Sequence, residues 1–333
     1  MILDGQSPAA IAEAARQLRS GELVAFPTET VYGLGADAAS DEAVAGIFRA
    51  KGRPSDHPLI VHIAAGAHGT RSLSRFAQPL PHFAQKLAKA FWPGPLTLIV
   101  TRQAGVAGAS AGGQDTNGLR CPAHPVAQAL LEACAELGVA GLAGPSANRF
   151  GRVSPTTAQH VHDEFGDALT VVDGGPCEVG IESTIVDCSR GVPVLLRPGA
   201  ISRVQIEAAC GEALRNPHDL AAPDPRASGT LASHYAPEAK VRLMDARALQ
   251  AALDVLGAQA AHIAVWARSP LKIRSQRVLQ RRMPDDAAAT AQQLFAVLRE
   301  FDSRAVRLIW IETPPETPEW EGVGDRLRRA AAT

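Results

Sequence analysis

The sequence lacks the features that mark membrane, secreted and zinc-binding proteins. No apolar run approaches the roughly 20 residues that a membrane-spanning helix requires, and the N-terminus has no charged-then-apolar signal pattern. The five cysteines are an odd number, lie far apart and form no CxxC pair, which argues against a disulfide framework or a zinc site. We therefore expect a soluble, cytoplasmic protein with reduced, mostly buried thiols and no membrane partner.

Several signatures of catalysis and nucleotide binding are also missing. The chain contains no GxxxxGK(S/T) phosphate loop, no GxGxxG between a strand and a helix, no HExxH and no Ser-His-Asp order. Lys plus Arg (33) nearly balance Asp plus Glu (34), so a phosphate-binding site must be a local feature rather than a property of the net charge.

What is present is enough apolar sequence for two α/β domains. The 333 residues are 46% apolar and 20% charged, which predicts a sizeable core and a length suited to two domains. Expected strands alternate with expected helices over residues 1–214. Residues 215–238 are rich in proline and predict a linker, and residues 239–333 predict a smaller α/β unit with a mostly parallel sheet.

A stretch near the N-terminus changes from an apolar run to polar residues and glycines. Residues 23–26 are typical of a buried strand, and Pro27 ends it because proline has no N–H for a strand ladder. Thr28, Glu29 and Thr30 follow, and glycines come soon after them. This pattern fits the mouth of a ligand-binding cleft, or a hairpin turn with incidental threonines.

Cations and histidines surround a second turn. Lys51 and Arg53 lie at the expected end of a helix, before a proline-braced turn with His57 and a strand with His62. The helix macrodipole alone favours cations there, but the pair could also clamp a phosphate. Arg120, at the end of a flexible loop, is either a surface arginine or a bidentate partner for a substrate carboxylate.

Three further polar clusters lie at strand ends. Ser146 and Asn148 offer hydrogen-bond donors after a short strand, and Ser154 or Thr156 could cap the next helix, whose N-terminus attracts phosphate. The other two clusters are residues 182–184 and 196–199. Because α/β domains assemble one cleft from strand ends, these residues predict a cleft rich in cations and hydroxyls, which favours anion binding over hydrolysis by a nucleophile.

Eight segments resemble, in order, the motifs of the YrdC-like family, in the long two-domain type of threonylcarbamoyl-AMP synthase. They are FPTETVYGLG, KGRPSDHPLIVHI, WPGPLT, GLRCPAHP, PSANRFGRVSPT, DGGP, ESTIVD and LRPG. The resemblance covers roughly residues 15–200. The segment SGTLASHYAP at residues 228–237 resembles the linker of the long type, and residues 240–331 correspond to its C-terminal domain.

The resemblance implies a fold and a reaction. The fold is a YrdC-like twisted open sheet flanked by helices, followed by a smaller Rossmann-like α/β domain. In the reaction, L-threonine, bicarbonate and ATP give threonylcarbamoyl-AMP and pyrophosphate. The product serves threonylcarbamoyladenosine modification of tRNA, through hand-over to the tRNA-modifying machinery. Mg²⁺ would accompany ATP, held largely by phosphate oxygens and water, and no protein metal site is expected.

The resemblance also assigns roles to residues of this chain. Those implied to hold L-threonine are Thr30, His62, Arg120, Gly144 and Ser183. Those implied to hold ATP are Arg53, His57, Thr116, Ser146, Ser154, Arg197 and Tyr235. Lys51 and Arg53 are implied to be catalytic, as the phosphate clamp, and residues 228–237 are expected to close over the cleft as a lid with Tyr235 on the nucleotide.

The chain departs from the family pattern at two positions. His57 stands where the family often has asparagine, which could make nucleotide contact depend on pH, and Gly144 stands where the family commonly has serine.

Alternative functions stay open at this point. A non-catalytic RNA-binding YrdC-like module would use the same basic cleft, and the basic run at residues 272–282 is either a solvated face or a weak RNA contact. A carbamoyl-adenylate transferase of the hydrogenase-maturation type is disfavoured because the chain lacks any CxxC.

Overall fold

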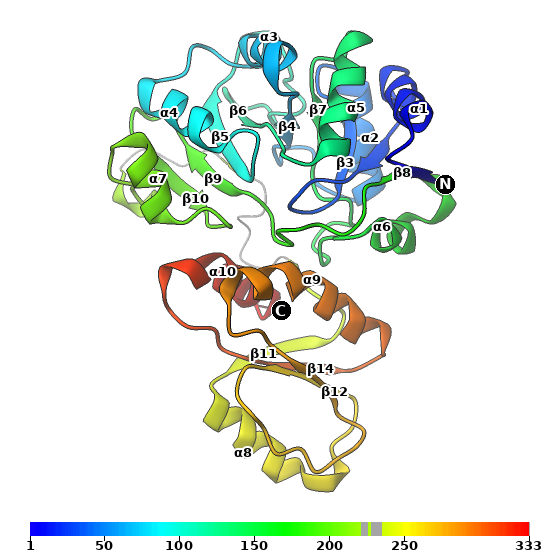
Figure 1. The fold of residues 1–333 in the computed structure, drawn as a ribbon, viewed down its shortest axis with the longest axis vertical. Helices are drawn as coiled ribbons and strands as arrows, with labels where there is room; N and C mark the ends of the chain where they lie inside the picture. The colour runs from blue at the N-terminus through cyan, green and yellow to red at the C-terminus, as the bar shows by residue number, and fades with distance from the viewer. Residues whose placement is uncertain (221–225, 228–234, 333) are drawn as a thin grey trace. The chain divides into compact units, whose positions relative to one another are not determined.

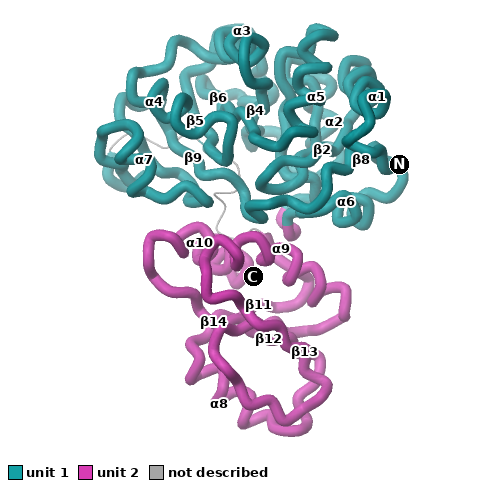
Figure 2. The backbone as a smooth tube through the Cα atoms, in the orientation of Figure 1, with its two compact units in different colours: residues 1–150, 154–230 teal, residues 151–153, 231–333 magenta. Residues whose placement is uncertain are grey.

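The computed structural model describes residues 1–220, 226–227 and 235–332 (Figure 1). The chain forms two compact units (Figure 2). Unit 1 comprises residues 1–150 and 154–230, and unit 2 comprises residues 151–153 and 231–333. The division at residues 230 and 231 falls inside the stretch that the sequence predicts as a linker, and residues 151–153 leave unit 1 for three residues before the chain returns to it.

Unit 1 is built on a ten-stranded mixed sheet with the strand order β1-β8-β2-β3-β7-β4-β6-β5-β9-β10. Its strands are β1 (Ile2–Asp4), β2 (Val24–Phe26), β3 (Gly33–Asp37), β4 (Ile60–His62), β5 (Leu96–Thr101), β6 (Thr116–Arg120), β7 (Leu142–Ala143), β8 (Thr170–Asp173), β9 (Thr184–Asp187) and β10 (Val194–Arg197). The β2–β8, β4–β6 and β5–β9 pairs are parallel, whereas β2–β3, β5–β6 and β9–β10 are antiparallel.

Helices cover both faces of this sheet (Figure 1). They are α1 (Pro8–Arg19), α2 (Asp41–Lys51), α3 (Gly66–Phe76), α4 (His82–Phe91), α5 (Pro125–Glu136), α6 (Ala158–Phe165) and α7 (Arg203–Cys210), with short 3₁₀ turns at η1 (Gly166–Ala168) and η2 (Pro217–Asp219). Successive strand residues point to opposite faces, so Val24 and Phe26 pack in the core cluster of α1 and α5 while Ala25 packs in the cluster of α2 and α4. The predicted α/β class is confirmed.

Capping residues set the ends of the helices that position the site. Ser7 and Ser40 accept hydrogen bonds from the backbone N–H groups of Ala10 and Ala43, which satisfies one orphan donor at each N-terminus. Gly52 ends α2 in the left-handed conformation, with φ of 64°, which glycine adopts without steric cost. The conformation of Gly52 therefore fixes the direction in which the chain continues after Lys51, the last residue of α2.

The glycines after Thr30 are in β3, which pairs with β2 as an antiparallel hairpin, so the hairpin that the sequence left open is present. Other local expectations need correction. Two elements, β1 and α3, were not expected, and β6 begins at Thr116, inside the stretch expected to be a loop. The N-cap of α6 is Thr157, which accepts from His160 N, and not Ser154 or Thr156.

Unit 2 contains a four-stranded sheet in which every pair is parallel, in the order β11-β14-β12-β13. Its elements are β11 (Lys240–Met244), α8 (Ala246–Leu256), η3 (Gly257–Gln259), β12 (Ile263–Ala267), β13 (Leu279–Arg282), α9 (Ala287–Ser303), β14 (Leu308–Glu312), η4 (Pro318–Trp320) and α10 (Glu321–Ala330). Helix α8 lies on one face of the sheet, and α9 and α10 lie on the other (Figure 1). The expected parallel α/β unit is confirmed.

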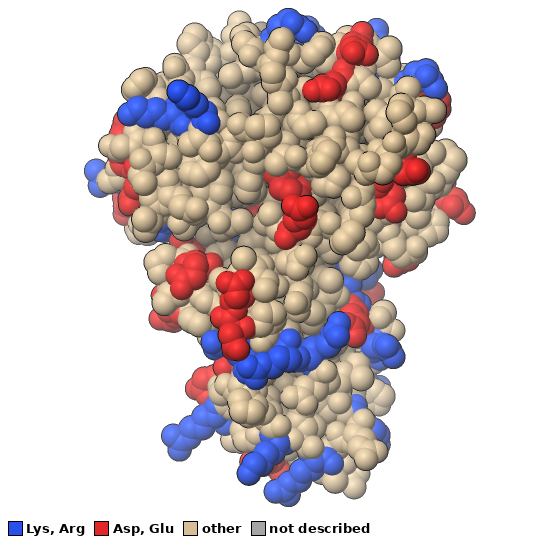
Figure 3. All heavy atoms as spheres, viewed as in Figure 1, with Lys and Arg blue, Asp and Glu red and all other residues tan. Residues whose placement is uncertain are grey.

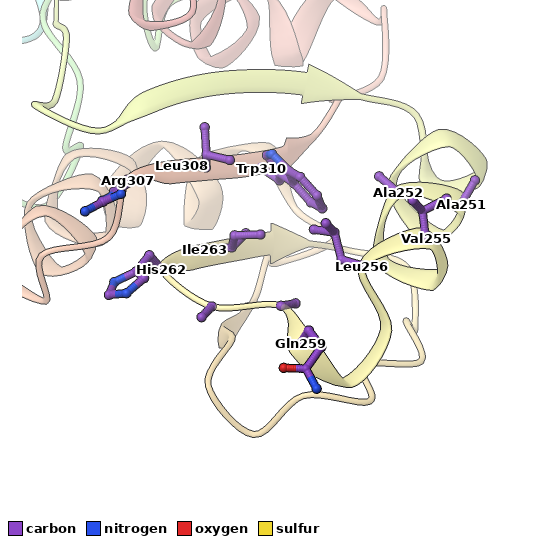
Figure 4. Close-up of a pocket in the computed structure, with 12 residues that line it drawn as sticks. Ala251, Ala252, Val255, Leu256, Gln259, His262, Ile263, Arg307, Leu308 and Trp310 are labelled. Atoms are coloured by element: carbon purple, nitrogen blue, oxygen red, sulfur yellow. The ribbon is translucent and has the colours of Figure 1, made fainter.

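A pocket of about 680 Å³ lies beside α8 in unit 2. Its floor is formed by Ile263, Leu308 and Trp310, and Val255 and Leu256 of α8 form one wall (Figure 4). Ile263 and Leu308 are the first residues of their strands, so the pocket is at the amino ends of a parallel sheet. Ligand sites of such sheets are usually at the carboxyl ends.

All five cysteines are buried and free, as the sequence predicts. Burial raises the pKa of Cys121 to about 11 and that of Cys134 to about 12. Among the described residues, no helix combines the length and the apolar character that a membrane span needs.

Candidate functional site

The loop between β2 and β3 holds two threonines that bind each other and an arginine. Thr28 Oγ1 lies 2.8 Å from Thr30 Oγ1 and also donates to the backbone oxygen of Val31 at 2.6 Å. Arg120, the last residue of β6, donates from Nη1 to Thr30 Oγ1 at 2.8 Å. Thr28 thus fixes the loop, and Thr30 and Arg120, both implied to hold threonine, are in direct contact.

Glu29, whose role the sequence left open, forms an ion pair with Arg120. Its Oε1 is 2.7 Å from Arg120 Nη2, and the two side chains are 7% and 4% exposed. Its Oε2 accepts from Ala123 N at 3.1 Å, and Arg120 Nε donates to Gly94 O at 3.3 Å. The ion pair with Glu29 and the hydrogen bonds to Thr30 Oγ1 and Gly94 O therefore hold the guanidinium, and Arg120 is a buried residue and not a surface arginine.

His62 and Gly144 lie against each other. A Cβ atom at Gly144 would come within 2.9 Å of His62 Nδ1, so glycine leaves room for the imidazole. The ring also meets Phe26 edge-on, with ring centroids 5.5 Å apart. Burial, and then the charge of Arg120, lower the pKa of His62 to about 3, so the imidazole is neutral at physiological pH.

Ser183 and Arg197 meet at the ends of the antiparallel pair β9–β10. Arg197 donates from Nε to Ser183 O at 3.0 Å and from Nη2 to Ser183 Oγ at 3.1 Å. On the neighbouring strand β5, Thr97 Oγ1 lies 2.7 Å from Ser183 Oγ. One residue implied to hold threonine is thereby bonded to one implied to hold ATP.

Lys51 ends α2 and is buried, with 3% of its surface exposed. Its Nζ donates to the backbone oxygens of Ser146 and Asn148, so it links α2 to the loop after β7. Burial, and then the neighbouring charge of Arg53, hold its pKa well below the usual lysine range, while Glu164 and Glu182 act in the opposite direction.

Arg53, His57 and Phe150 form a small group beside Lys51. Arg53 donates from Nη2 to Pro58 O at 3.0 Å, and its guanidinium lies 5.8 Å from the centroid of the Phe150 ring. The His57 ring meets Phe150 at 5.6 Å between centroids. Partial burial, and then the charge of Arg53, lower the pKa of His57.

Three expected nucleotide residues have different surroundings. Ser154 is fully buried and donates to Glu182. Thr116 begins β6 and is half-buried, and no side-chain hydrogen bond joins it to another described site residue. Tyr235 belongs to unit 2, where it is 1% exposed and packs 5.4 Å from the Phe295 ring and 5.2 Å from the Arg326 guanidinium.

The expected lid falls largely outside the part of the chain that the structure describes. Residues 228–234 are not described, so the closing of residues 228–237 over the cleft stays a prediction. The adjoining residues are tied within unit 2, because Ala236 N donates to Gly151 O at 2.9 Å and Arg152 pairs with Glu238 at 3.1 Å.

The site has few acidic side chains, and two of them contact other side chains of the site. Glu29 binds Arg120, and Glu182 accepts from Ser154. Among the described residues, no group of three or more His, Cys, Asp or Glu side chains could hold a metal ion. The arrangement suits an anionic ligand held by guanidinium, hydroxyl and ammonium groups.

Four residues of the site were missed or left without a role by the sequence. Glu29 and Glu182 stood in the recognised segments, but nothing in their spacing named Arg120 or Ser154 as their partners. Thr97 and Phe150 also stood in recognised segments, WPGPLT and PSANRFGRVSPT, but no role was assigned to them, because a threonine in a strand and an aromatic in a loop have many structural uses.

The basic run in unit 2 is partly neutralised. Arg281 pairs with Glu300 at 2.8 Å and Arg282 with Asp285 at 3.1 Å. On the face drawn in Figure 3, acidic and basic side chains both occur on each unit. These contacts favour a solvated face, and an RNA contact stays a prediction.

Comparison with known proteins assigns both parts of the chain to one family. Residues 16–199 match the family model Sua5_yciO_yrdC, described as "Telomere recombination". Residues 201–332 match the model described as "Threonylcarbamoyl-AMP synthase, C-terminal domain".

Curated relatives and solved structures match nearly the whole chain. Threonylcarbamoyl-AMP synthase of Pyrococcus abyssi is 38% identical over 96% of this chain and 93% of its own length. The synthase of Bacillus subtilis is 38% identical over 96% of this chain and 92% of its own. A crystal structure of P. abyssi Sua5 complexed with L-threonine has a TM-score of 0.87 at 36% identity, covering 98% of this chain and 95% of that one. The chain belongs to the two-domain Sua5/YrdC-type threonylcarbamoyl-AMP synthase family.

Proposed function

We propose that this protein is a nucleotidyltransferase that forms threonylcarbamoyl-AMP and pyrophosphate from L-threonine, bicarbonate or CO₂, and ATP. The observation that carries the proposal is the bond from Arg197 to Ser183, because it joins the two sets of residues that the family resemblance implies for the two substrates. The relative crystallised with L-threonine supports the amino-acid half of the site.

The amino acid is held by Thr30, Arg120, His62 and Ser183. Arg120 offers charge for the substrate carboxylate, and Glu29 and Thr30 fix the plane of its guanidinium. Neutral His62 adds a hydrogen-bonding group without adding positive charge. The backbone at Gly144 lies beside that imidazole.

ATP is held by Arg53, Arg197 and Lys51, with Ser146, Ser154, His57 and Thr116 along the nucleotide. Tyr235 remains a proposed nucleotide contact, although in unit 2 it packs against Phe295. Mg²⁺ accompanies the phosphates and neutralises charge on them, coordinated mainly by phosphate oxygens and water.

The reaction needs orientation and charge neutralisation more than a protein nucleophile. The threonine amine adds to CO₂ and loses a proton, which gives a carbamate. A carbamate oxygen then bonds to the α-phosphorus of ATP as the bond to pyrophosphate breaks. Lys51 and Arg53 neutralise the charge that develops on the phosphates. The mixed anhydride is then passed to the machinery that modifies tRNA.

One experiment tests this function. The protein is incubated with ATP, Mg²⁺ and bicarbonate, with threonine, with serine or with neither, and the carbamoyl-adenylate is sought by mass while pyrophosphate is measured. We expect threonine-dependent product and pyrophosphate in equal amounts, and none without Mg²⁺. Pyrophosphate release that does not depend on threonine, or no product with threonine, would contradict the proposal.

A further inference from the structure

Thr97 is a buried hydroxyl beside the site to which neither the sequence nor the comparisons assign a role. It is the second residue of β5, has no exposed surface, and places its Oγ1 2.7 Å from Ser183 Oγ. We propose that Thr97 is a positioning residue, which directs the Ser183 hydroxyl so that its proton points to an oxygen of the bound amino acid. This inference rests on the proposed function.

A count of protons and acceptors supports the assignment. Arg197 Nη2 donates into Ser183 Oγ, which leaves this oxygen one lone pair and one proton. Thr97 brings one proton and one acceptor oxygen. Only one of the two hydroxyl protons can lie between Thr97 and Ser183, and the side chains make no other hydrogen bond with a described residue. The cluster is therefore one acceptor short.

The missing acceptor belongs beside Ser183 and not beside Thr97. Thr97 lies within β5, which is flanked in the sheet by β6 and β9, whereas Ser183 precedes β9 and lies outside the ladder. Both hydroxyls are fully buried, so the proton that does not lie between Thr97 and Ser183 needs an acceptor of its own. A ligand bound beside Ser183 supplies that acceptor when Thr97 donates to Ser183 and Ser183 offers its own proton to the ligand.

The ligand group that completes the cluster is an oxygen acceptor near a guanidinium. Arg197 brings positive charge to the same hydroxyl, so a carboxylate or hydroxyl oxygen of the amino acid fits the position, and an ammonium group does not. Because Ser183 is bonded to Arg197, an amino acid that binds Ser183 also steadies a residue proposed to hold ATP.

The test compares Thr97→Val with Thr97→Ser. Valine keeps the shape of threonine and removes only the hydroxyl, so Ser183 loses its donor and its fixed direction. We expect the KM for threonine to rise about two- to tenfold, the usual weight of one neutral hydrogen bond, with little change in the KM for ATP. Thr97→Ser should restore the wild-type KM. The matched control is Thr101→Val, at the exposed end of the same strand.

Binding measurements and a double variant separate positioning from a general packing effect. Threonine affinity, measured by calorimetry without ATP, should fall with Thr97→Val by the same factor as the KM rises. In a Ser183→Ala background, Thr97→Val should have no further effect, because Thr97 acts only through Ser183.

Three outcomes would overturn the assignment of Thr97. They are an unchanged KM for threonine, equal losses for threonine and ATP, or additive effects with Ser183→Ala. If the wild-type protein forms no carbamoyl-adenylate, the proposed function fails instead, and the calorimetric comparison still reports on Thr97.

Discussion

At the scale of single residues, His62 makes the stability of unit 1 depend on pH. Its pKa is lowered to about 3 from an ordinary value of 6.5. Between these two values the unfolded chain binds a proton that the folded protein does not, so stability is greatest above pH 6.5 and falls as the pH decreases.

Because of this histidine, we expect the free energy of unfolding to be about 2 kcal/mol lower at pH 5 than at pH 7. His62→Asn should lose that part of the pH dependence, as measured by urea unfolding at the two pH values. The control is His218→Asn, whose side chain is 81% exposed. An identical pH dependence in wild type and His62→Asn would refute the burial argument.

Glu29 is the second residue whose effect can be predicted. Replacing it with glutamine leaves the buried Arg120 without its acidic partner, and breaking a buried ion pair from one side costs about 3–5 kcal/mol. We expect Glu29→Gln to lower the unfolding free energy by roughly that amount and to raise the KM for threonine. Glu178→Gln, at an exposed residue, should change neither, and a stable Glu29→Gln protein with normal threonine binding would argue against the ion pair's role.

At the scale of elements, the end of α2 determines where Lys51 and Arg53 lie. Gly52 has φ of 64°, and a Cβ atom added there would meet nothing within 4 Å, so alanine would be strained by the backbone alone. We expect Gly52→Ala to lower the unfolding free energy by about 1 kcal/mol and to raise the KM for ATP.

The matched control for this prediction is Gly46→Ala, in the interior of the same helix. Its Cβ would meet Leu23 at 3.4 Å, which is ordinary contact, and alanine is favoured over glycine inside a helix by about 1 kcal/mol. Urea unfolding should therefore show opposite signs for the two variants. The same sign would mean that space, and not backbone conformation, controls the helix end.

Helix ends and strands differ in how much of their signal is local. The helix end expected at Lys51 and Arg53 is correct, because the end of a helix depends on nearby residues alone, here on Gly52. The strand β3 was missed because glycines weaken the strand signal, and its pairing with β2 comes from a hairpin that returns through the threonines.

The same distinction between local and long-range information applies to the site. The recognised segments identified Thr30, Arg120 and Ser183, but the hydrogen-bond partners of these residues depend on the order of the strands in the sheet. Arg120 is 90 residues from Thr30 in sequence and Ser183 is 86 from Thr97. No local pattern contains such contacts, so Glu29 and Thr97 had no assigned role until β2, β5, β6 and β9 were placed in one sheet.

At the scale of the whole molecule, the short segment 151–153 belongs to unit 2 but directly precedes Ser154 of unit 1 in the sequence. Its residues pack in unit 2, where Arg299 Nη2 donates to Val153 O, while the next residue, Ser154, is a proposed ATP contact. We expect Arg299→Ala to raise the KM for ATP a few-fold and to leave the KM for threonine unchanged. Arg304→Ala, just beyond α9, is the control, and equal effects of the two variants would contradict the connection.

Alkylation of the buried cysteines should report local unfolding of this protein. Because burial keeps Cys121 and Cys134 protonated far above neutral pH, and only the thiolate reacts with alkylating reagents, the native state should be inert to them. Labelling would then proceed only through opened states, and each modified cysteine would mark which part of unit 1 had opened. The charges of Glu29 and Arg120 act on Cys177 as well as on Cys121, so these two thiols would report on the threonine-binding side of the cleft.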